Sequence, residues 1–209
     1  MQELTESVLS IFPTPIYTSF LKRNLLNDEK KFITQQKNFI INKTNSEFNI
    51  TNSASLNKNV LNENVFINLK KFILDETNNF LLNVLQFVDI EPYITQSWLN
   101  YTEQNEYHLS HNHPNSFYSG VLYLQTNNDQ IVFENSRYDA LVPNVKQGNI
   151  FNVKYFTLNV KDNQLIIFPS FLKHQVNFKS TKDTRISLAF NIWIKGKLGQ
   201  KHSLSELYV

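Results

Sequence analysis

Four of the five histidines in this 209-residue chain lie in a pattern that could bind a metal ion. His108, His111 and His113 are close together in the sequence, and His174 follows 61 residues after His113. Arg185 stands eleven residues beyond His174. Neutral imidazoles bind divalent first-row metals, and a guanidinium binds a carboxylate through two parallel hydrogen bonds. The pattern therefore predicts a mononuclear metal site with an anionic co-ligand.

Strand parity indicates which histidines share a face. Residues two apart in an extended strand point the same way, so His111 and His113 should lie on one side with their Cβ atoms within about 7 Å. His108 falls on the opposite face if the strand is unbroken, and we expect His202 to be a solvated tail residue. A strand opened by His174 could face the pair in a jelly roll, and three imidazoles leave positions open for substrate or oxygen. A single histidine is more often a core or surface residue, so the prediction depends on the combination.

The candidate strand over residues 184–194 has two different faces. Arg185 and Ser187 share one face, and the residues on the other are all apolar, which predicts that this second face packs against helices. Because a buried guanidinium is costly without a partner and the nearby sequence offers no obvious carboxylate, we expect an anionic ligand to bind Arg185. The rest of the first face is Ala189, Asn191 and Trp193, and the apolar face is Ile186, Leu188, Phe190, Ile192 and Ile194.

Two helices are predicted in the first ninety residues. Residues 28–41 could form a helix that Asn27 caps, and residues 64–87 carry apolar side chains at helical spacings. Residues 43–62, rich in Asn, Ser and Thr, predict a loop between them. The expected apolar faces are Phe32, Ile33, Phe39 and Ile40 in the first helix, and Phe66, Leu69, Ile73, Phe80, Val84 and Phe87 in the second.

From residue 95 onward the apolar period changes to two, which is typical of strands. About eight short strands in a hundred residues match the count of a jelly roll. We therefore predict a mainly β (α+β) fold, a double-stranded β-helix of the jelly-roll or cupin-like type, with the N-terminal helices packed on one sheet. The predicted strands are 95–102, 107–113, 119–126, 130–135, 148–160 (two strands or one), 165–169, 174–178 and 184–194. The chain is expected to form a single domain over 1–209, divided into a helical support region (1–92), the β-helix core (93–196) and a C-terminal tail (197–209).

Composition bounds the class of protein. Hydrophobic residues make up 41% of the chain and the formal net charge is +2, which favours a folded globule and gives no electrostatic footprint for nucleic acid. The absence of cysteine excludes disulfides and thiolate chemistry. The N-terminus lacks the pattern of a signal peptide, and no apolar run approaches a membrane span. We expect a cytoplasmic protein without membrane partners, in which an exposed strand edge could serve a homodimer.

The chemistry-bearing segments resemble the 2-oxoglutarate- and Fe(II)-dependent oxygenases, and in particular a branch found in marine phages and bacteria. The resemblance covers nearly the whole chain, and the combination of segments is specific. The matching segments are Phe12–Pro15, Ser97–Asn100, the His-x-His-Pro segment His111–Ser116, Ser119–Leu124, Ile167–His174 and Arg185–Asn191.

That resemblance implies a set of site residues. In the superfamily a His-x-Asp/Glu pair and a distal histidine hold the iron, so His111 corresponds to the first ligand and His174 to the distal one. His113 stands where the acid is expected, a departure that the His-x-His-Pro branch shares. Arg185 corresponds to the arginine that grips the far carboxylate of 2-oxoglutarate, with Ser187 completing an Arg-x-Ser pair. A tyrosine on the strand after His-x-His often helps to bind the same carboxylate, and Tyr123 corresponds to it, although Tyr123 could equally be a core residue. The resemblance implies no catalytic residue beyond the metal ligands.

The implied activity is hydroxylation of an unidentified small-molecule or peptide substrate by O2, with release of succinate and CO2. An all-histidine site also leaves open a metal other than Fe(II). Two alternatives remain at this point. One is a cupin-like three-histidine dioxygenase that does not use 2-oxoglutarate, and the other is a non-catalytic jelly-roll binding or phage structural protein. The Arg-x-Ser pair speaks against the first, because such an enzyme has no need of a dicarboxylate clamp.

Overall fold

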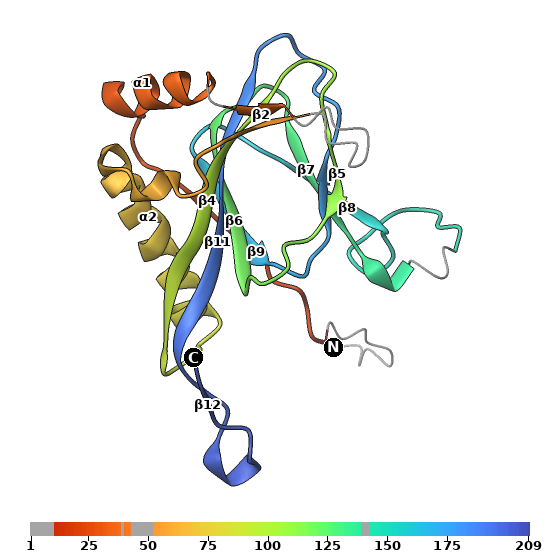
Figure 1. Ribbon diagram of the computed structural model, residues 1–209. Helices are drawn as coiled ribbons and strands as arrows, with labels where there is room; N and C mark the ends of the chain where they lie inside the picture. The colour runs from red at the N-terminus through yellow and green to blue at the C-terminus, as the bar shows by residue number, and fades with distance from the viewer. Residues whose placement is uncertain (1–10, 39, 43–51, 139–142) are drawn as a thin grey trace, which may run out of the picture.

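The computed structural model describes residues 11–38, 40–42, 52–138 and 143–209. It contains two antiparallel sheets that face each other, in a double-stranded β-helix with helices on one side (Figure 1). The larger sheet runs β1 (Tyr17–Phe20), β9 (Gln164–Pro169), β6 (Tyr118–Gln125), β11 (Arg185–Leu198), β4 (Ile90–Thr102), β3 (Ser53–Ser55) and β2 (Ile40–Asn42), with β12 (Leu207–Tyr208) paired to β11. The smaller sheet runs β5 (His108–His111), β10 (His174–Val176), β7 (Gln130–Glu134) and β8 (Tyr155–Asn159).

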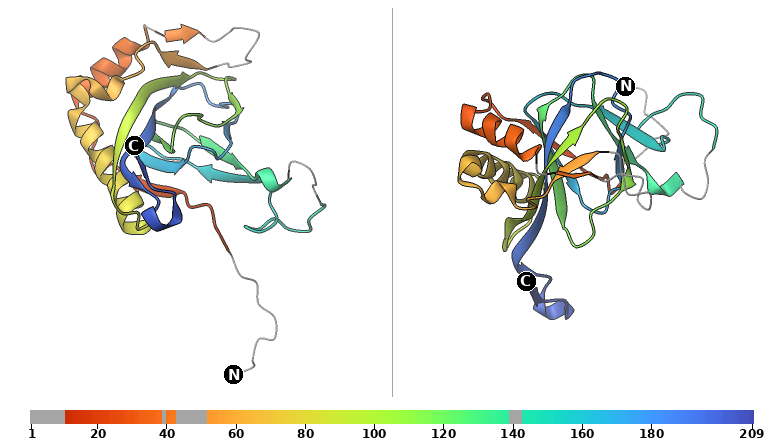
Figure 2. Two further views of the ribbon diagram at one scale, coloured as in Figure 1. Left: turned by 60° about the horizontal axis from the view of Figure 1, so that its bottom comes forward. Right: turned by 45° about the horizontal axis from the view of Figure 1, so that its top comes forward.

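The helices form a third layer on the outer face of the larger sheet, opposite the smaller sheet (Figures 1 and 2). The layer comprises α1 (Asn27–Gln36), the 3-10 turns η1 (Val60–Asn62) and η2 (Asn64–Phe66), α2 (Ile67–Asn78) and a π-helical segment η3 (Asn79–Val84). This arrangement confirms the predicted fold class and the placement of the N-terminal helices on one sheet. Two short 3-10 turns, η4 (Ser136–Tyr138) and η5 (Lys201–Ser203), lie in later loops.

Alternation along the central strands divides the interior into two cores. On β11, Leu188, Phe190 and Ile192 pack with the helices, which confirms the predicted apolar face. On β6, Leu122 joins the same core while Tyr123 faces the smaller sheet, because successive side chains point to opposite faces. Strands covered on both faces read as continuous buried runs. The space between the two sheets is therefore lined by one face of β6, β9 and β11.

All eight predicted strands are present, most within three residues of the predicted bounds, and residues 148–160 contribute the single strand β8. The predicted first helix is too long, because α1 ends at Gln36 and residues 40–42 form β2. Asn27 does not cap it; the cap position is Leu26, whose N–H donates to the Glu29 carboxylate at 2.7 Å. Phe39 and the side chain of Ile40 lie outside the described residues.

The predicted loop over residues 43–62 is only partly correct. Its last part contains β3 and η1, and residues 43–51 lie outside the described residues. The second helix is present, but its last expected apolar positions are solvent-exposed, Val84 at 58% and Phe87 at 37%. The helix becomes a π-helix at Asn79, which changes the angle between successive side chains, so α-helical periodicity no longer predicts which residues are buried there.

The domain boundaries proposed at residues 92 and 197 fall inside β4 and β11. The C-terminal segment is not a free tail, since Tyr208 pairs with Lys197 and Leu207 with Leu198. Figure 1 shows this hairpin extending away from the two sheets. Among the described residues, no helix combines the length and apolar character that crossing a membrane requires.

Gly120 on β6 leaves no room for a side chain between Phe190 on β11 and Ile166 on β9, so it provides a test of this packing. A Cβ at this position would lie 2.9 Å from the Ile166 carbonyl oxygen and would clash with the Phe190 ring. Gly120→Ala should therefore lower the free energy of unfolding by about 1–3 kcal/mol, the usual cost of overpacking. Urea denaturation measures this. Gly148→Ala is the control, because Gly148 is exposed and its added Cβ would approach a single side-chain atom, Val153 Cγ1 at 2.9 Å. Equal effects of the two variants would contradict the packing described.

Candidate metal centre

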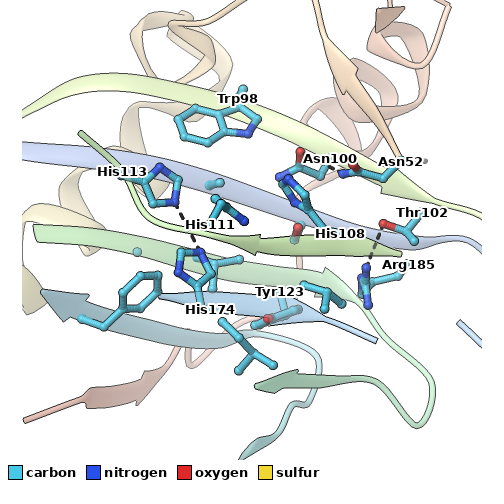
Figure 3. Close-up of a pocket in the computed structure, with 17 residues that line it drawn as sticks. Asn52, Trp98, Asn100, Thr102, His108, His111, His113, Tyr123, His174 and Arg185 are labelled. Atoms are coloured by element: carbon cyan, nitrogen blue, oxygen red, sulfur yellow. Dashed lines mark hydrogen bonds between the residues drawn. The ribbon is translucent and has the colours of Figure 1, made fainter. Parts of the chain in front are cut away.

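A cavity lies between the two sheets and collects side chains from both (Figure 3). Its volume is about 60 Å³, several times what one water molecule needs. His111, His113 and His174 gather toward one side in this view, and Arg185 lies toward the other. The lining residues used below are Asn52, Trp98, Asn100, Thr102, His108, His111, His113, Tyr123, His174, Arg185 and Ser187.

Three histidines converge within the cavity. One ring nitrogen from each of His111, His113 and His174 lies within 4.8 Å of the others. The Nε2 atoms of His113 and His174 are 3.4 Å apart. Two nitrogens bound to one ion at ~2.1 Å would be separated by about 3.0–3.4 Å, for octahedral to tetrahedral angles. The spacing of His113 and His174 is therefore that of two ligands of one metal ion, and the His111 nitrogen lies within 4.8 Å of both.

Backbone pairing places these histidines. The antiparallel register of β5 and β10 puts His111 directly opposite His174. His113 follows the end of β5, and its N–H donates to the Ser170 carbonyl at 3.0 Å, which holds it beside β9. The His174 ring also contacts the Phe168 ring edge-to-face, with centroids 4.6 Å apart. The ligands thus come from two neighbouring strands and one anchored turn rather than from flexible loops.

Hydrogen bonds orient two of the rings. The Nδ1 of His111 lies 2.8 Å from the Leu109 carbonyl, and the Nδ1 of His174 lies 3.1 Å from the Leu172 carbonyl. Because a carbonyl oxygen only accepts, each Nδ1 carries the proton, and each Nε2 keeps its lone pair. A backbone partner on the second ring nitrogen is typical of metal-binding histidines.

The protonation state also suits a metal site. Burial, together with the neighbouring His111, lowers the pKa of His113 from 6.5 to about 4. Burial lowers the pKa of His174 well below its usual value, and the nearby histidines add to this effect. Both rings are therefore neutral at neutral pH, the form that binds metal ions.

His108 departs from the prediction. It lines the cavity, and its ring stacks on that of His111 with centroids 4.1 Å apart. The reason is a register shift: Val176 pairs with His108 and His174 with His111, so three residue steps on β5 oppose two on β10. An extra residue in one strand reverses the alternation beyond it. His108 therefore faces the cavity, whereas an unbroken strand would have placed it on the opposite face.

Arg185 also departs from the prediction, because it has a carboxylate partner. Its Nη1 lies 3.2 Å from Asp129 Oδ1, and its Nη2 donates to the Thr102 hydroxyl at 2.9 Å. Asp129 precedes β7, 56 residues from Arg185 in the sequence, and both side chains are buried. Lys179, whose side chain is fully buried, lies 3.3 Å from the other oxygen of Asp129. The expectation that no carboxylate of the chain pairs with Arg185 was wrong.

The remaining predicted residues line the same cavity. Ser187 is adjacent to Arg185 on the same face of β11, and Tyr123 is its register partner on β6. Burial raises the pKa of the Tyr123 hydroxyl, and the nearby charges of Arg185 and Asp129 act on it in opposite directions. The hydroxyl is therefore protonated and can donate a hydrogen bond.

Asn100 on β4 also lines the cavity. The Tyr101 hydroxyl instead donates to the Ile33 carbonyl in the helical layer, and Asn191 bonds to Ser119. Sequence reasoning missed Asn52, Trp98, Asp129 and Lys179. Trp98 lies within the matching segment Ser97–Asn100, whereas no local motif indicates the other three residues.

The low pKa of His113 predicts how stability depends on pH. Between pH 6.5 and 4 the unfolded chain binds more protons at this position than the folded chain, so the metal-free protein should lose stability as pH falls through this window. The loss should reach at most about 3 kcal/mol from this residue. Urea denaturation in the presence of a chelator measures it. His113→Gln should flatten the profile and His202→Gln should not; an unchanged slope in His113→Gln would contradict the assignment.

Comparisons with known proteins support the fold, and one family model matches the segment that contains the site residues. No curated protein matches the chain in sequence. The model of a family described as "Putative 2OG-Fe(II) oxygenase" matches residues 96–191, a segment that contains the three histidines and Arg185.

Solved structures share the architecture at low sequence identity. An oxidoreductase of the 2OG-Fe(II) oxygenase family from Burkholderia pseudomallei has 13% identity over 84% of each chain, with a TM-score of 0.54. HygX from Streptomyces hygroscopicus, solved with nickel, 2-oxoglutarate and hygromycin B, has 11% identity over 86% of this chain and 82% of its own, with a TM-score of 0.54. A prolyl-4-hydroxylase from Pseudomonas putida has 11% identity over 85% and 92%, with a TM-score of 0.57. The matched family and the Burkholderia protein are described as 2OG-Fe(II) oxygenases, and the chain shares the double-stranded β-helix fold of these structural neighbours.

Proposed function

We propose that this chain is an Fe(II)- and 2-oxoglutarate-dependent dioxygenase that hydroxylates a small molecule or a peptide side chain. The observation that carries the proposal is the convergence of three imidazoles in the cavity that Arg185 also lines. The family match over residues 96–191 and the metal-bound and 2-oxoglutarate-bound neighbour support it.

His111, His113 and His174 would hold the iron through one ring nitrogen each. Replacing the acid expected of a facial triad by His113 removes one negative charge from the ligand set. We expect weaker metal binding than a two-histidine, one-carboxylate site would give, and a more electron-poor ion. Three protein ligands leave positions for the co-substrate and O2.

Arg185, Ser187 and Tyr123 would bind the distal carboxylate of 2-oxoglutarate. The Asp129 and Thr102 bonds use two of the five guanidinium N–H groups, so donors remain for a carboxylate. When bound, iron and 2-oxoglutarate supply the oxidising chemistry, in which O2 is consumed and succinate and CO2 are released. The protein contributes orientation and exclusion of water, since the cavity is walled by Val121, Ile131 and Phe168.

One observation favours a second candidate, a three-histidine dioxygenase that does not use 2-oxoglutarate. Asp129 already balances part of the Arg185 charge, so Arg185 does not require an anionic ligand for its own burial. Anaerobic addition of 2-oxoglutarate to the Fe(II) protein distinguishes the two. A charge-transfer absorption band on addition supports the proposed function, and its absence supports the second candidate.

The ligand assignment is tested with His174→Ala. This change removes a buried ligand, so Fe(II) or Ni(II) affinity measured by calorimetry should fall by at least about a hundredfold, and formation of succinate should stop. His113→Asp is the matched comparison and should keep the metal, because it restores a carboxylate to the ligand set. Succinate formation at the normal rate in His174→Ala would show that the site lies elsewhere.

Arg185→Met tests the co-substrate assignment separately. Loss of the guanidinium should weaken 2-oxoglutarate binding by on the order of a hundredfold, as expected when a charged hydrogen-bonded pair is removed. Metal affinity should change little, because Arg185 does not belong to the histidine cluster. Unchanged affinity for 2-oxoglutarate would exclude Arg185 from its site.

A further inference from the structure

The Arg185 guanidinium belongs to a buried network of charged side chains. Asp129 bridges two cations, with Oδ1 at 3.2 Å from Arg185 Nη1 and Oδ2 at 3.3 Å from Lys179 Nζ. The side chains of Asp129, Arg185 and Lys179 are 4%, 5% and 0% exposed. Full burial of a lysine is rare and costly unless its charge is balanced.

All donors of Lys179 are used within the network. Its ammonium group contacts Asp129, the Thr181 hydroxyl at 2.7 Å, and Asp183 at 3.3 Å. An ammonium has three N–H groups, so Lys179 has none left for a ligand. Lys179 is also absent from the cavity lining, whereas Arg185 lines it. Any effect of Lys179 on a bound ligand must therefore act through Asp129 and Arg185.

The charges of the network decide how strongly Arg185 attracts an anion. Arg185 and Asp129 alone form a buried pair with no net charge, which would attract a carboxylate weakly. Lys179 makes the buried trio net positive by one. Asp183, its other carboxylate partner, is 35% exposed, so solvent screens its charge more strongly.

We infer that Lys179 is a positioning residue that engages the Asp129 carboxylate and so preserves the positive charge of Arg185 for the distal carboxylate of the co-substrate. This inference rests on the proposed function and extends it, since it assigns selectivity for dicarboxylic 2-oxo acids to a residue outside the cavity. Asp129 holds the guanidinium in place together with Thr102, and Lys179 offsets the charge that Asp129 brings.

The test compares binding of 2-oxoglutarate and of 2-oxobutyrate, which lacks the distal carboxylate, to the anaerobic Fe(II) protein by calorimetry. Lys179→Met should raise the Kd of 2-oxoglutarate on the order of tenfold or more, because Asp129 then neutralises Arg185. The Kd of 2-oxobutyrate should stay within about twofold, since this ligand has no group for Arg185 to bind. Equal losses for both ligands would indicate a merely structural role and overturn the inference.

A double variant gives the sharper result. Asn can still accept the Arg185 hydrogen bond but carries no charge, so Asp129→Asn combined with Lys179→Met should restore the 2-oxoglutarate Kd to within about threefold of the wild type. A purely structural role for the ion pairs predicts no such rescue. If Lys179→Met does not fold, Asp129→Asn alone decides the matter: it should bind 2-oxoglutarate more tightly than the wild type, and weaker binding would overturn the inference.

Glu29→Gln is the control for loss of a buried charge that is paired away from the cavity. Glu29 is fully buried and pairs with Arg23 at 2.6 Å in the helical layer, away from the cavity. This variant should lower thermal stability without changing either Kd. Failure of the wild-type Fe(II) protein to bind 2-oxoglutarate would overturn the proposed function itself. Normal wild-type binding with an unchanged Lys179→Met would overturn only the inference about Lys179.

Discussion

The site depends on the alternation of side chains along β11, which lies between β4 and β6 in the larger sheet. One face of this strand, with Leu188 and Phe190, packs beneath the helices. The other face carries Arg185 and Ser187 into the cavity between the sheets. Because the side-chain period of a strand is two, a shift of one residue would send the guanidinium into the apolar core and the leucine into the cavity. The helical layer therefore secures the position of Arg185 as well as stabilising the fold.

The second feature of the site is that its polar groups are held by partners before any ligand is considered. Carbonyl groups orient the rings of His111 and His174, and Asp129 and Thr102 orient Arg185. Groups fixed in this way need little reorganisation on binding, which favours affinity and specificity. These partners also affect ligand binding. The buried Asp129 carboxylate weakens the attraction of Arg185 for an anion, and the buried Lys179 ammonium offsets this effect.

Much of the β region could be predicted from the sequence, since its strands show the period of two that half-buried strands require. The three histidines and Arg185 could be named as candidates from residue type and spacing, and alternation placed Arg185 and Ser187 on one face of β11. Other parts could not be predicted. Helix α1 ends before its apolar pattern does, β3 follows a polar segment without strand periodicity, and the π-helical turn after α2 changes the spacing on which the predicted apolar face relied.

The sequence by itself determined the fold class, the histidines that could serve as metal ligands and the two faces of β11, because these follow from residue type and local period. Only the tertiary structure decided the place of His108 and the partners of Arg185. A single extra residue in β5 reverses the parity that local reasoning assumes, and its presence depends on the pairing with β10. Likewise, Asp129 lies 56 residues from Arg185 and 50 residues from Lys179 in the sequence, so its contacts with both cations exist only in the folded chain.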